Sequence, residues 1–218
     1  AIGSIMSRSH SNYVIWGAGF MDNTENSGGG KPCLLRGVFS ARKFEKEGFG
    51  KCEVYGDPAL LLPLVYTPQV KEKFKYGIIP HMRDYAKIIK EYPKDKIINL
   101  NDRIENVIDN INSCEYIIST SLHGVIVAHA YGVPAIWVKE GYIYTDGIKF
   151  QDYFSSVGIP QYDGSDFSLS DFVGKSYTNL SENVKGYMLP YRNLAEVQRG
   201  ILYAAPFKIK RNILDKVK

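Results

Sequence analysis

The sequence predicts an α/β protein in which short parallel strands alternate with helices. Short apolar runs rich in β-branched residues recur along the chain, and amphipathic segments with helical spacing separate them. Glycines, prolines and small hydroxyl residues interrupt these runs where turns are expected. Strands that alternate with helices through short loops form parallel sheets with right-handed crossovers. The 218 residues, 44% of them hydrophobic, are enough for one large domain or two small ones.

The clearest unit of this kind spans residues 115–138. The apolar run at 116–119 predicts a buried strand, helical spacing predicts a helix that Gly132 and Pro134 end, and the run at 134–138 predicts a second strand. Open α/β sheets bind ligands at the carboxyl ends of their strands, and a helix that begins there directs its positive end at the ligand. The residues in this turn are Ser121, Leu122, His123 and Gly124.

The first half of the chain has a shorter series of elements. Residues 1–6 are expected to end a strand, and further strands are expected at 13–16, 33–35 and 52–55, with a helix at 38–47. Two polar residues follow two of these strands at their carboxyl ends, namely Arg36 and Asp57. At least one opening β-α unit is missing, so this half is expected to be incomplete.

The second half alternates more regularly. Strands are expected at 76–79 and 96–100 before the unit at 115–138, and His81 and Arg83 follow the first of them. The predicted helices lie at 85–91, 101–114, 151–157 and 182–204, the last with a break at Pro190. Because the two sets divide near residues 62–73, we predict two Rossmann-like domains, 1–67 and 68–218.

Charge and cysteine content narrow the class of protein. The formal charge is +4, and the three cysteines form no Cys-x-x-Cys pair, which indicates a reducing compartment and no zinc site. Neither a nucleic-acid-binding motif nor an acidic metal-binding cluster is recognisable. No apolar run reaches transmembrane length, and no signal peptide opens the chain. The basic C-terminal stretch KIKRNILDKVK, residues 208–218, leaves open a peripheral contact with a membrane surface.

Five blocks resemble one known family when they are taken in order. They are RGVFSARKFEKEG, VYGDPALLLP, GIIPHMRDY, ISTSLHGVIVAHAYGVPAIWV and IKFQDYFSSVGI. The chain resembles the polysaccharide pyruvyl transferases over roughly residues 1–160, and within them the bacterial branch that adds ketal pyruvate to exopolysaccharide units. This resemblance implies a GT-B-like fold, with two Rossmann-like halves whose parallel sheets face each other across a cleft. It also implies a cytoplasmic location, either free in the cytoplasm or at the inner face of the membrane.

The same resemblance implies phosphoenolpyruvate as donor, a saccharide or lipid-linked saccharide as acceptor, and no cofactor. Ketal formation needs cations for two anionic groups and one group that moves protons near neutral pH. His123 is therefore the expected proton shuttle, and Arg36 is the expected bidentate anchor of the donor. Many members carry Arg where this chain has Ser121, so Arg83 and Lys149 are further candidates for the donor's charge. His81 and Asp57 are secondary candidates.

Two other functions fit the same fold. A GT-B-type glycosyltransferase would bind a nucleotide sugar in place of phosphoenolpyruvate. A non-catalytic carbohydrate-binding module would bind a saccharide without turnover, which the incomplete first half allows. Stabilisation by phosphoenolpyruvate and not by UDP or GDP would separate the first alternative from a pyruvyl transferase, and release of phosphate would exclude the second.

Overall fold

The computed structural model describes residues 3–70, 73–140 and 145–217. They fall into two compact units, which share the chain unequally. Unit 1 holds residues 1–65, 144–161 and 190–218, and unit 2 holds residues 66–143 and 162–189. Each unit contains a three-stranded parallel sheet with helices beside it, which confirms the predicted α/β class. The predicted domain boundary between residues 67 and 68 lies near the change from unit 1 to unit 2 after residue 65. The prediction assigned residues 144–161 and 190–218 to the second domain, whereas they belong to unit 1.

The sheet of unit 1 has the order β1-β2-β3 with all strands parallel. The strands are β1 (Gly3–Ser4), β2 (Val14–Gly19) and β3 (Lys31–Leu35). The strand predicted at 52–55 is reduced to one parallel bridge between Leu35 and Tyr55. The helices of this unit are α1 (Val38–Lys46), α5 (Ile148–Val157), α7 (Leu194–Tyr203) and α8 (Arg211–Leu214), with 3-10 turns at Met6–Arg8, Pro58–Leu64 and Asp215–Val217.

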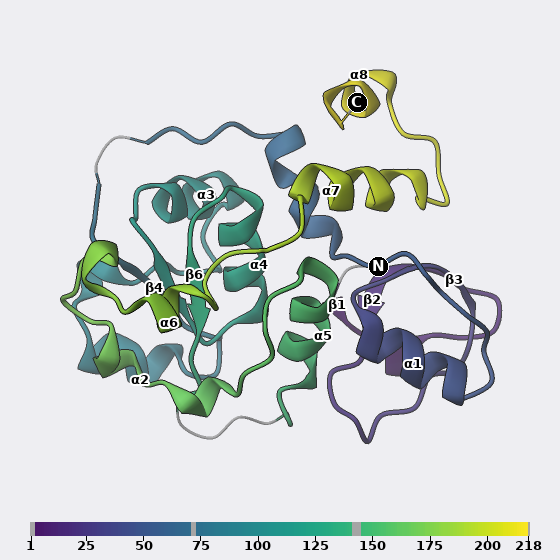
Figure 1. Ribbon diagram of the computed structural model, residues 1–218, viewed down its shortest axis with the longest axis horizontal. Coiled ribbons are helices and arrows are strands. Elements are labelled where there is room, and N and C mark those ends of the chain that lie inside the picture. The colour runs from purple at the N-terminus through teal and green to yellow at the C-terminus, as the bar shows by residue number, and fades with distance from the viewer. Residues whose placement is uncertain (1–2, 71–72, 141–144, 218) are drawn as a thin grey trace. The chain divides into compact units, whose positions relative to one another are not determined.

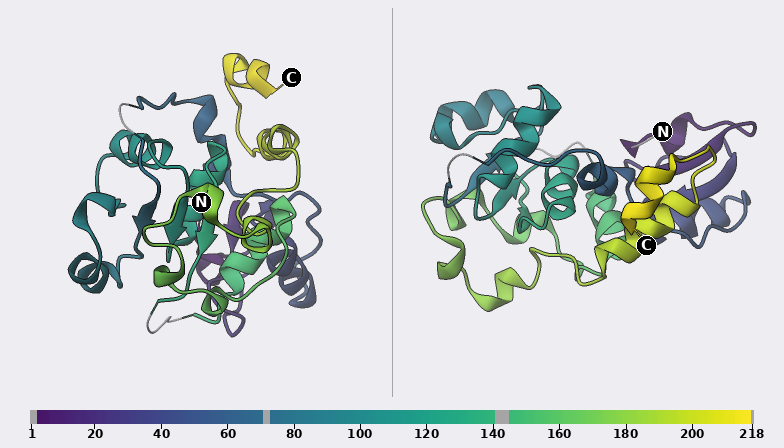
Figure 2. Two further views of the ribbon diagram at one scale, coloured as in Figure 1. Left: turned by 60° about the vertical axis from the view of Figure 1, so that its left-hand side comes forward. Right: turned by 90° about the horizontal axis from the view of Figure 1, so that it is seen from above.

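Segments distant in sequence complete the core of unit 1. Helix α5 packs against α1 although about a hundred residues separate them in the chain (Figure 1). The C-terminal helices are yellow in Figure 2, and α7 is joined to strand β2 of the same unit by a side-chain contact. There the indole N–H of Trp16 donates a hydrogen bond of 3.0 Å to the carbonyl of Ile201. The unit's core therefore needs residues from both ends of the chain.

The sheet of unit 2 has the order β4-β5-β6, again with all strands parallel. The strands are β4 (Gly77–Ile79), β5 (Ile117–Ser119) and β6 (Ala135–Trp137), and all of their residues are buried. Helix α4 packs on β5 and β6, and α3 packs on α4 (Figure 1). The helices are α2 (Tyr85–Glu91), α3 (Ile104–Asn112), α4 (Leu122–Ala130) and α6 (Glu182–Lys185), with 3-10 turns at Lys94–Lys96, Gly164–Asp166, Leu169–Asp171 and Tyr177–Asn179.

Several predicted boundaries are corrected. The strand expected at 96–100 is wrong, because Pro93 opens a 3-10 turn and leaves a single parallel bridge between Ile78 and Ile97. The helix expected from residue 101 begins at Ile104, since the Asp102 carboxylate accepts the Arg103 amide and competes with the helical bond.

The remaining differences concern α5 and α7 of unit 1 and α6 of unit 2. Helix α5 begins at Ile148, three residues before the start of the helix expected at 151–157. The helix expected at 182–204 is two helices, and the break falls at the predicted proline. Among the described residues, no helix is both long and apolar enough to cross a membrane.

Candidate functional site

The carboxyl edge of the sheet in unit 2 gathers several of the residues singled out in the sequence. Strands β4 and β5 are parallel, and their register pairs Ile79 with Ser119. The loops that follow, 80–84 and 120–121, therefore leave the sheet side by side. This edge is where open α/β sheets bind their ligands.

A threonine hydroxyl joins these two loops. The Oγ1 of Thr120 accepts a hydrogen bond of 2.7 Å from the amide of His81 and donates one of 3.0 Å to the carboxylate of Asp84. Beside it, the hydroxyl of Ser119 donates to the carbonyl of Ile79 at 3.0 Å. Because both hydroxyls are buried, these bonds hold the two loops in one arrangement.

The loop after β4 presents His81 and Arg83. The backbone amide of Arg83 donates to Nδ1 of His81 at 3.3 Å. A ring nitrogen that accepts a hydrogen bond carries no proton, so the neutral imidazole of His81 has its proton on Nε2. His81 is half-buried and Arg83 is exposed, so both are accessible to a solute at this edge.

His123 differs from every other residue of α4. All other residues of this helix are buried, whereas His123, at its second position, is half-buried. The helix begins after Ser121, and no side chain caps its first amides. Uncapped amides at the start of a helix favour an anion. An imidazole and these amide groups are thus presented at the same edge of the sheet.

Gly124 lets helix α4 pack closely on the sheet. A Cβ atom at this position would lie 2.5 Å from Oγ of Ser119 and 2.7 Å from Cγ2 of Ile79. Real Cβ atoms do not approach other atoms so closely, so only glycine lets α4 lie this close to β4 and β5. Leu122 and Ser121 are also buried, which leaves their backbone groups as their contribution to the edge.

Arg36, the predicted donor anchor, lies in unit 1 and is fully buried. Its Nε donates to Oδ2 of Asp152 at 3.0 Å, its Nη1 to Oγ of Ser4 at 2.6 Å, and its Nη2 to the carbonyl of Phe20 at 2.6 Å. The same carboxylate accepts bonds of 2.8 Å and 2.6 Å from the amide and hydroxyl of Ser40. These contacts favour a structural role for Arg36.

Two glycines leave room for this buried ion pair. A Cβ atom on Gly19 would lie 2.5 Å from Cζ of Arg36, and one on Gly37 would collide with the backbone of Asp152. The ion pair is thus enclosed by strands β1 to β3 and helices α1 and α5 of unit 1.

Lys149 and Asp57 also lie in unit 1. Lys149 is buried, with Nζ 3.9 Å from the sulfur of Met21. Asp57 is buried as well, and its Oδ1 accepts a hydrogen bond of 2.9 Å from the amide of Ala59, so it caps the 3-10 turn that follows. Burial raises the pKa of Tyr153 well above its usual value, and the charge of Asp57 adds to this shift. Asp57 therefore acts as the N-cap of this turn.

A comparison with protein-family models decides the family. The model named polysaccharide pyruvyl transferase matches residues 9–142, which is more than half of the chain. The chain belongs to the polysaccharide pyruvyl transferase family. The match includes the edge described above and both histidines at it. Lys149 and Asp152 lie beyond the matched residues of this pyruvyl transferase family member.

One curated relative carries no further functional description. An uncharacterized protein of Acanthamoeba polyphaga mimivirus is 33% identical over 172 residues, which cover 72% of this chain. The aligned part spans 59% of the length of that relative. No solved structure matches this pyruvyl transferase family member.

Three residues that organise these regions were not among the predicted site residues. Thr120 and Asp84 connect the loops in unit 2. In the sequence, Thr120 is a hydroxyl residue directly after a predicted strand, and Asp84 is an acidic residue directly before a predicted helix. Each is next to a residue that was named, Ser121 and Arg83 respectively. Asp152 lies between aromatic residues of an apolar helix, and a lone acid in such a segment indicates a buried cationic partner. In the part of the chain that the structure describes, no group of three His, Cys, Asp or Glu side chains could hold a metal ion.

Proposed function

We propose that the protein transfers pyruvate from phosphoenolpyruvate to a sugar of an exopolysaccharide or capsule unit, as a ketal. Family membership supports a pyruvyl transferase, and the carboxyl edge of the sheet in unit 2 supplies the groups that the donor half-reaction needs. The observation that carries the proposal is the position of His123, which alone in α4 escapes burial and lies at the start of that helix.

In this reaction the imidazole of His123 moves the protons. In its charged form it delivers a proton to the methylene carbon of phosphoenolpyruvate, while a sugar hydroxyl forms a bond to the adjacent carbon. The imidazole takes up the proton of that hydroxyl, a second hydroxyl then displaces phosphate from the same carbon, and its proton leaves with the phosphate. Histidine suits this step because it exchanges protons near neutral pH.

The donor's two anionic groups need cations and N–H donors. Arg83, exposed in the loop after β4, is the guanidinium that we assign to one anion, since its fork matches a carboxylate or phosphate. The first amides of α4, without a side-chain cap, donate to the other. His81 can add a donor through Nε2. Arg36 was also predicted to anchor the donor, but its guanidinium is buried and already bonded to Asp152, so it is the weakest of these candidates.

Release of inorganic phosphate tests the reaction directly. The protein is incubated with phosphoenolpyruvate and a panel of hexose-containing acceptors, and phosphate release that depends on both substrates is expected. In a parallel thermal-shift measurement, phosphoenolpyruvate should raise the melting temperature more than UDP or GDP does. Stabilisation by a nucleoside diphosphate without phosphate release would instead support a nucleotide-sugar glycosyltransferase.

Replacing His123 by Gln tests the proton shuttle. Turnover should fall by about 10²–10⁴-fold, while the affinity for phosphoenolpyruvate should change little, because loss of a general acid affects the transition state. The exposed His10 of unit 1 offers a matched control, and His10→Gln should retain activity. Near-native turnover of His123→Gln would show that this histidine is not the shuttle.

A further inference from the structure

The C-terminal segment 203–217 concentrates positive charge. It carries four cationic side chains and one carboxylate, and its cations are Lys208, Lys210, Arg211 and Lys216. This segment begins at the last residue of α7 and includes α8 and the last 3-10 turn. We refer to residues 203–217 as the basic tail.

One side of the basic tail is anchored to unit 1. Leu64, Leu202 and Val217 form a buried hydrophobic cluster, and partly buried residues of the tail and of the 3-10 turn at Pro58–Leu64 pack against it. These partly buried residues are Leu61, Ile209, Ile213 and Leu214. In addition, Nζ of Lys216 donates a hydrogen bond of 2.5 Å to the carbonyl of Leu64. The aliphatic side chains of the tail are therefore fixed on unit 1, whereas its cations Lys208, Lys210 and Arg211 are exposed.

The outer side of the tail, defined by the exposed residues Tyr203, Lys208, Lys210 and Arg211, borders a hollow. A cavity of about 520 Å³ lies there, and Tyr203, Ile209 and Arg211 are among the residues that line it. Tyr203 is 70% exposed and Phe207 54% exposed, although Phe207 also contacts the ring of Trp16 edge-to-face. Large aromatic side chains so exposed on a charged segment are typical of an interaction surface.

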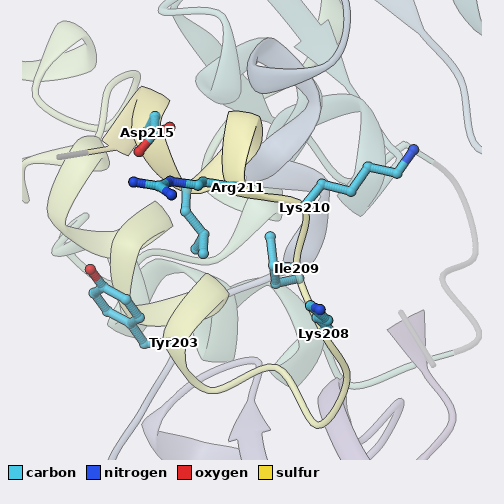
Figure 3. A pocket seen from close by; sticks show the side chains of 7 residues that line it. Tyr203, Lys208, Ile209, Lys210, Arg211 and Asp215 are labelled. Carbon is cyan, nitrogen blue, oxygen red and sulfur yellow. The ribbon is translucent and has the colours of Figure 1, made fainter.

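The cations on this surface diverge. Figure 3 shows that Arg211 and Lys210 leave the backbone in opposite directions, with the side chain of Lys208 below them. Asp215 lies near Arg211, so the carboxylate offsets part of the charge at one end of the hollow. Cations that point apart do not enclose a single phosphate. They fit a partner whose negative charges are spread over a plane.

We propose that the outer side of the basic tail docks on a membrane surface rich in anionic phospholipid. Lys208, Lys210 and Arg211 contact the phosphate groups, and Tyr203 enters the interfacial layer, where aromatic rings with a polar group are favoured. The surface adds a binding function that is independent of the pyruvyl-transfer proposal, since it lies outside the family-matched residues 9–142.

Two other anionic partners fit less well. A free phosphate or phosphorylated sugar would need converging donors, which the diverging side chains of Lys210 and Arg211 do not provide. A nucleic acid would need a basic groove that follows its backbone. The tail instead carries aliphatic residues, Ile209 and Leu214, in the lining of its hollow.

Vesicle sedimentation of the whole protein tests this proposal. Binding is measured with vesicles of phosphatidylcholine alone and with vesicles in which about a third of the lipid is phosphatidylglycerol. We expect binding only to the anionic vesicles, and its loss when NaCl is raised from about 0.1 M to about 1 M. The triple variant Lys208→Gln, Lys210→Gln, Arg211→Gln should lose on the order of 100-fold in partitioning, because each basic residue near such a surface contributes about fivefold.

A matched control separates local from overall charge. Lys90, Lys94 and Lys175 are exposed residues of unit 2, and replacing all three by Gln lowers the net charge by the same amount. This control should bind like the native protein, and Tyr203→Ser should bind several-fold more weakly. The far-ultraviolet circular dichroism of each variant should be unchanged.

Four results would overturn the proposal. They are equal binding to both vesicle types, equal losses in the two triple variants, displacement from vesicles by millimolar inorganic phosphate, and tail-dependent binding of a single-stranded oligonucleotide without vesicle binding. The third would identify a discrete anion site, and the fourth a nucleic-acid surface.

Discussion

Arg36 keeps its charge in a position that water does not reach. Removing a guanidinium from water is costly, and the cost is offset only when a counter-ion and hydrogen bonds replace the solvent. Here Asp152 provides the counter-ion at 3.0 Å, and Ser4 and Phe20 accept the remaining bonds. The charge is therefore stable only while each of these partners stays in place.

Breaking this ion pair from one side should destabilise the fold. We expect Arg36→Met, which leaves the carboxylate of Asp152 buried without its cation, to lower the free energy of unfolding by about 3–5 kcal/mol. Urea unfolding at neutral pH measures the change. Lys51→Met is the control, because the Lys51–Glu45 pair is largely exposed and such pairs contribute less than about 1 kcal/mol. Equal effects of the two substitutions would contradict the argument.

His129 is the second buried polar residue whose role is structural. Its Nε2 lies 3.0 Å from the carbonyl of Met188, so the neutral ring donates its proton there. Burial lowers its pKa from 6.5 to about 4. Above pH 6.5 the ring is neutral in both the folded and the unfolded chain. Between pH 6.5 and about 4 only the unfolded chain takes up the proton, so stability falls as the pH falls.

This linkage predicts a specific pH dependence. From pH 7 to pH 5, the contribution of His129 should lower the free energy of unfolding by about 2 kcal/mol. In His129→Gln, which keeps a donor for the carbonyl of Met188, that part of the decrease should disappear. Urea unfolding of both proteins at the two pH values measures the difference. Identical decreases would show that the pKa of His129 is not lowered by folding.

At the scale of the element, α4 shows how a helix is fitted to its sheet. Its apolar residues surround the helix and do not form one stripe, because every residue of the helix except His123 is buried. Gly124 sets how closely this helix approaches the strands, because its missing side chain leaves room for Ser119 and Ile79.

Two glycines within helices should respond oppositely to the same substitution. Gly124→Ala should destabilise the protein by about 1–3 kcal/mol, since the new methyl group would force β4 and β5 away from α4. In α7, Gly200→Ala should stabilise it by about 0.5–1 kcal/mol, because the added Cβ would lie 3.7 Å from Val54 and alanine favours a helix. Thermal unfolding compares both variants with the native protein. A stabilising Gly124→Ala would refute the packing argument.

Local patterns predicted most elements but not those that depend on competing bonds. The helix at 85–91 was predicted with its observed bounds, because a proline follows it and no side chain competes with its backbone bonds. The strand expected at 96–100 failed, since a 3-10 turn leaves Ile97 as its only bridge to β4. The periodicity of apolar residues shows which face of an element is apolar, but it does not show which carbonyl accepts the hydrogen bond of a given backbone amide.

At the scale of the whole molecule, parallel register explains which site residues could be predicted together. His81, Arg83 and His123 follow neighbouring parallel strands, and their common edge was visible in the sequence. The burial of Arg36 was not visible, because its partner Asp152 stands 116 residues later in the chain. The cleft expected between two facing halves, and the roles of the residues at it, stay predictions.

The division into units leads to a prediction for a shortened chain. Residues 190–218 belong to unit 1 although unit 2 precedes them in sequence. They supply Val197, Ile201 and Leu202, all buried. Burying three side chains of this size contributes roughly 5–9 kcal/mol, which is comparable with the whole stability of a domain.

A chain that ends at residue 189 should therefore lose the structure of unit 1 and keep that of unit 2. The hydrogen bond from Trp16 to Ile201 and the one from Gln198 to Leu60 would disappear, whereas the amide of Ala135 would still reach the carbonyl of Met188. Hydrogen exchange measures each sheet separately, since strand amides exchange slowly only while the sheet is intact. Exchange in β2 and β3 should become fast and exchange in β4 to β6 should stay slow. Slow exchange in β2 of the shortened chain would show that residues 1–67 form a domain without the C-terminal segment, as the sequence alone predicted.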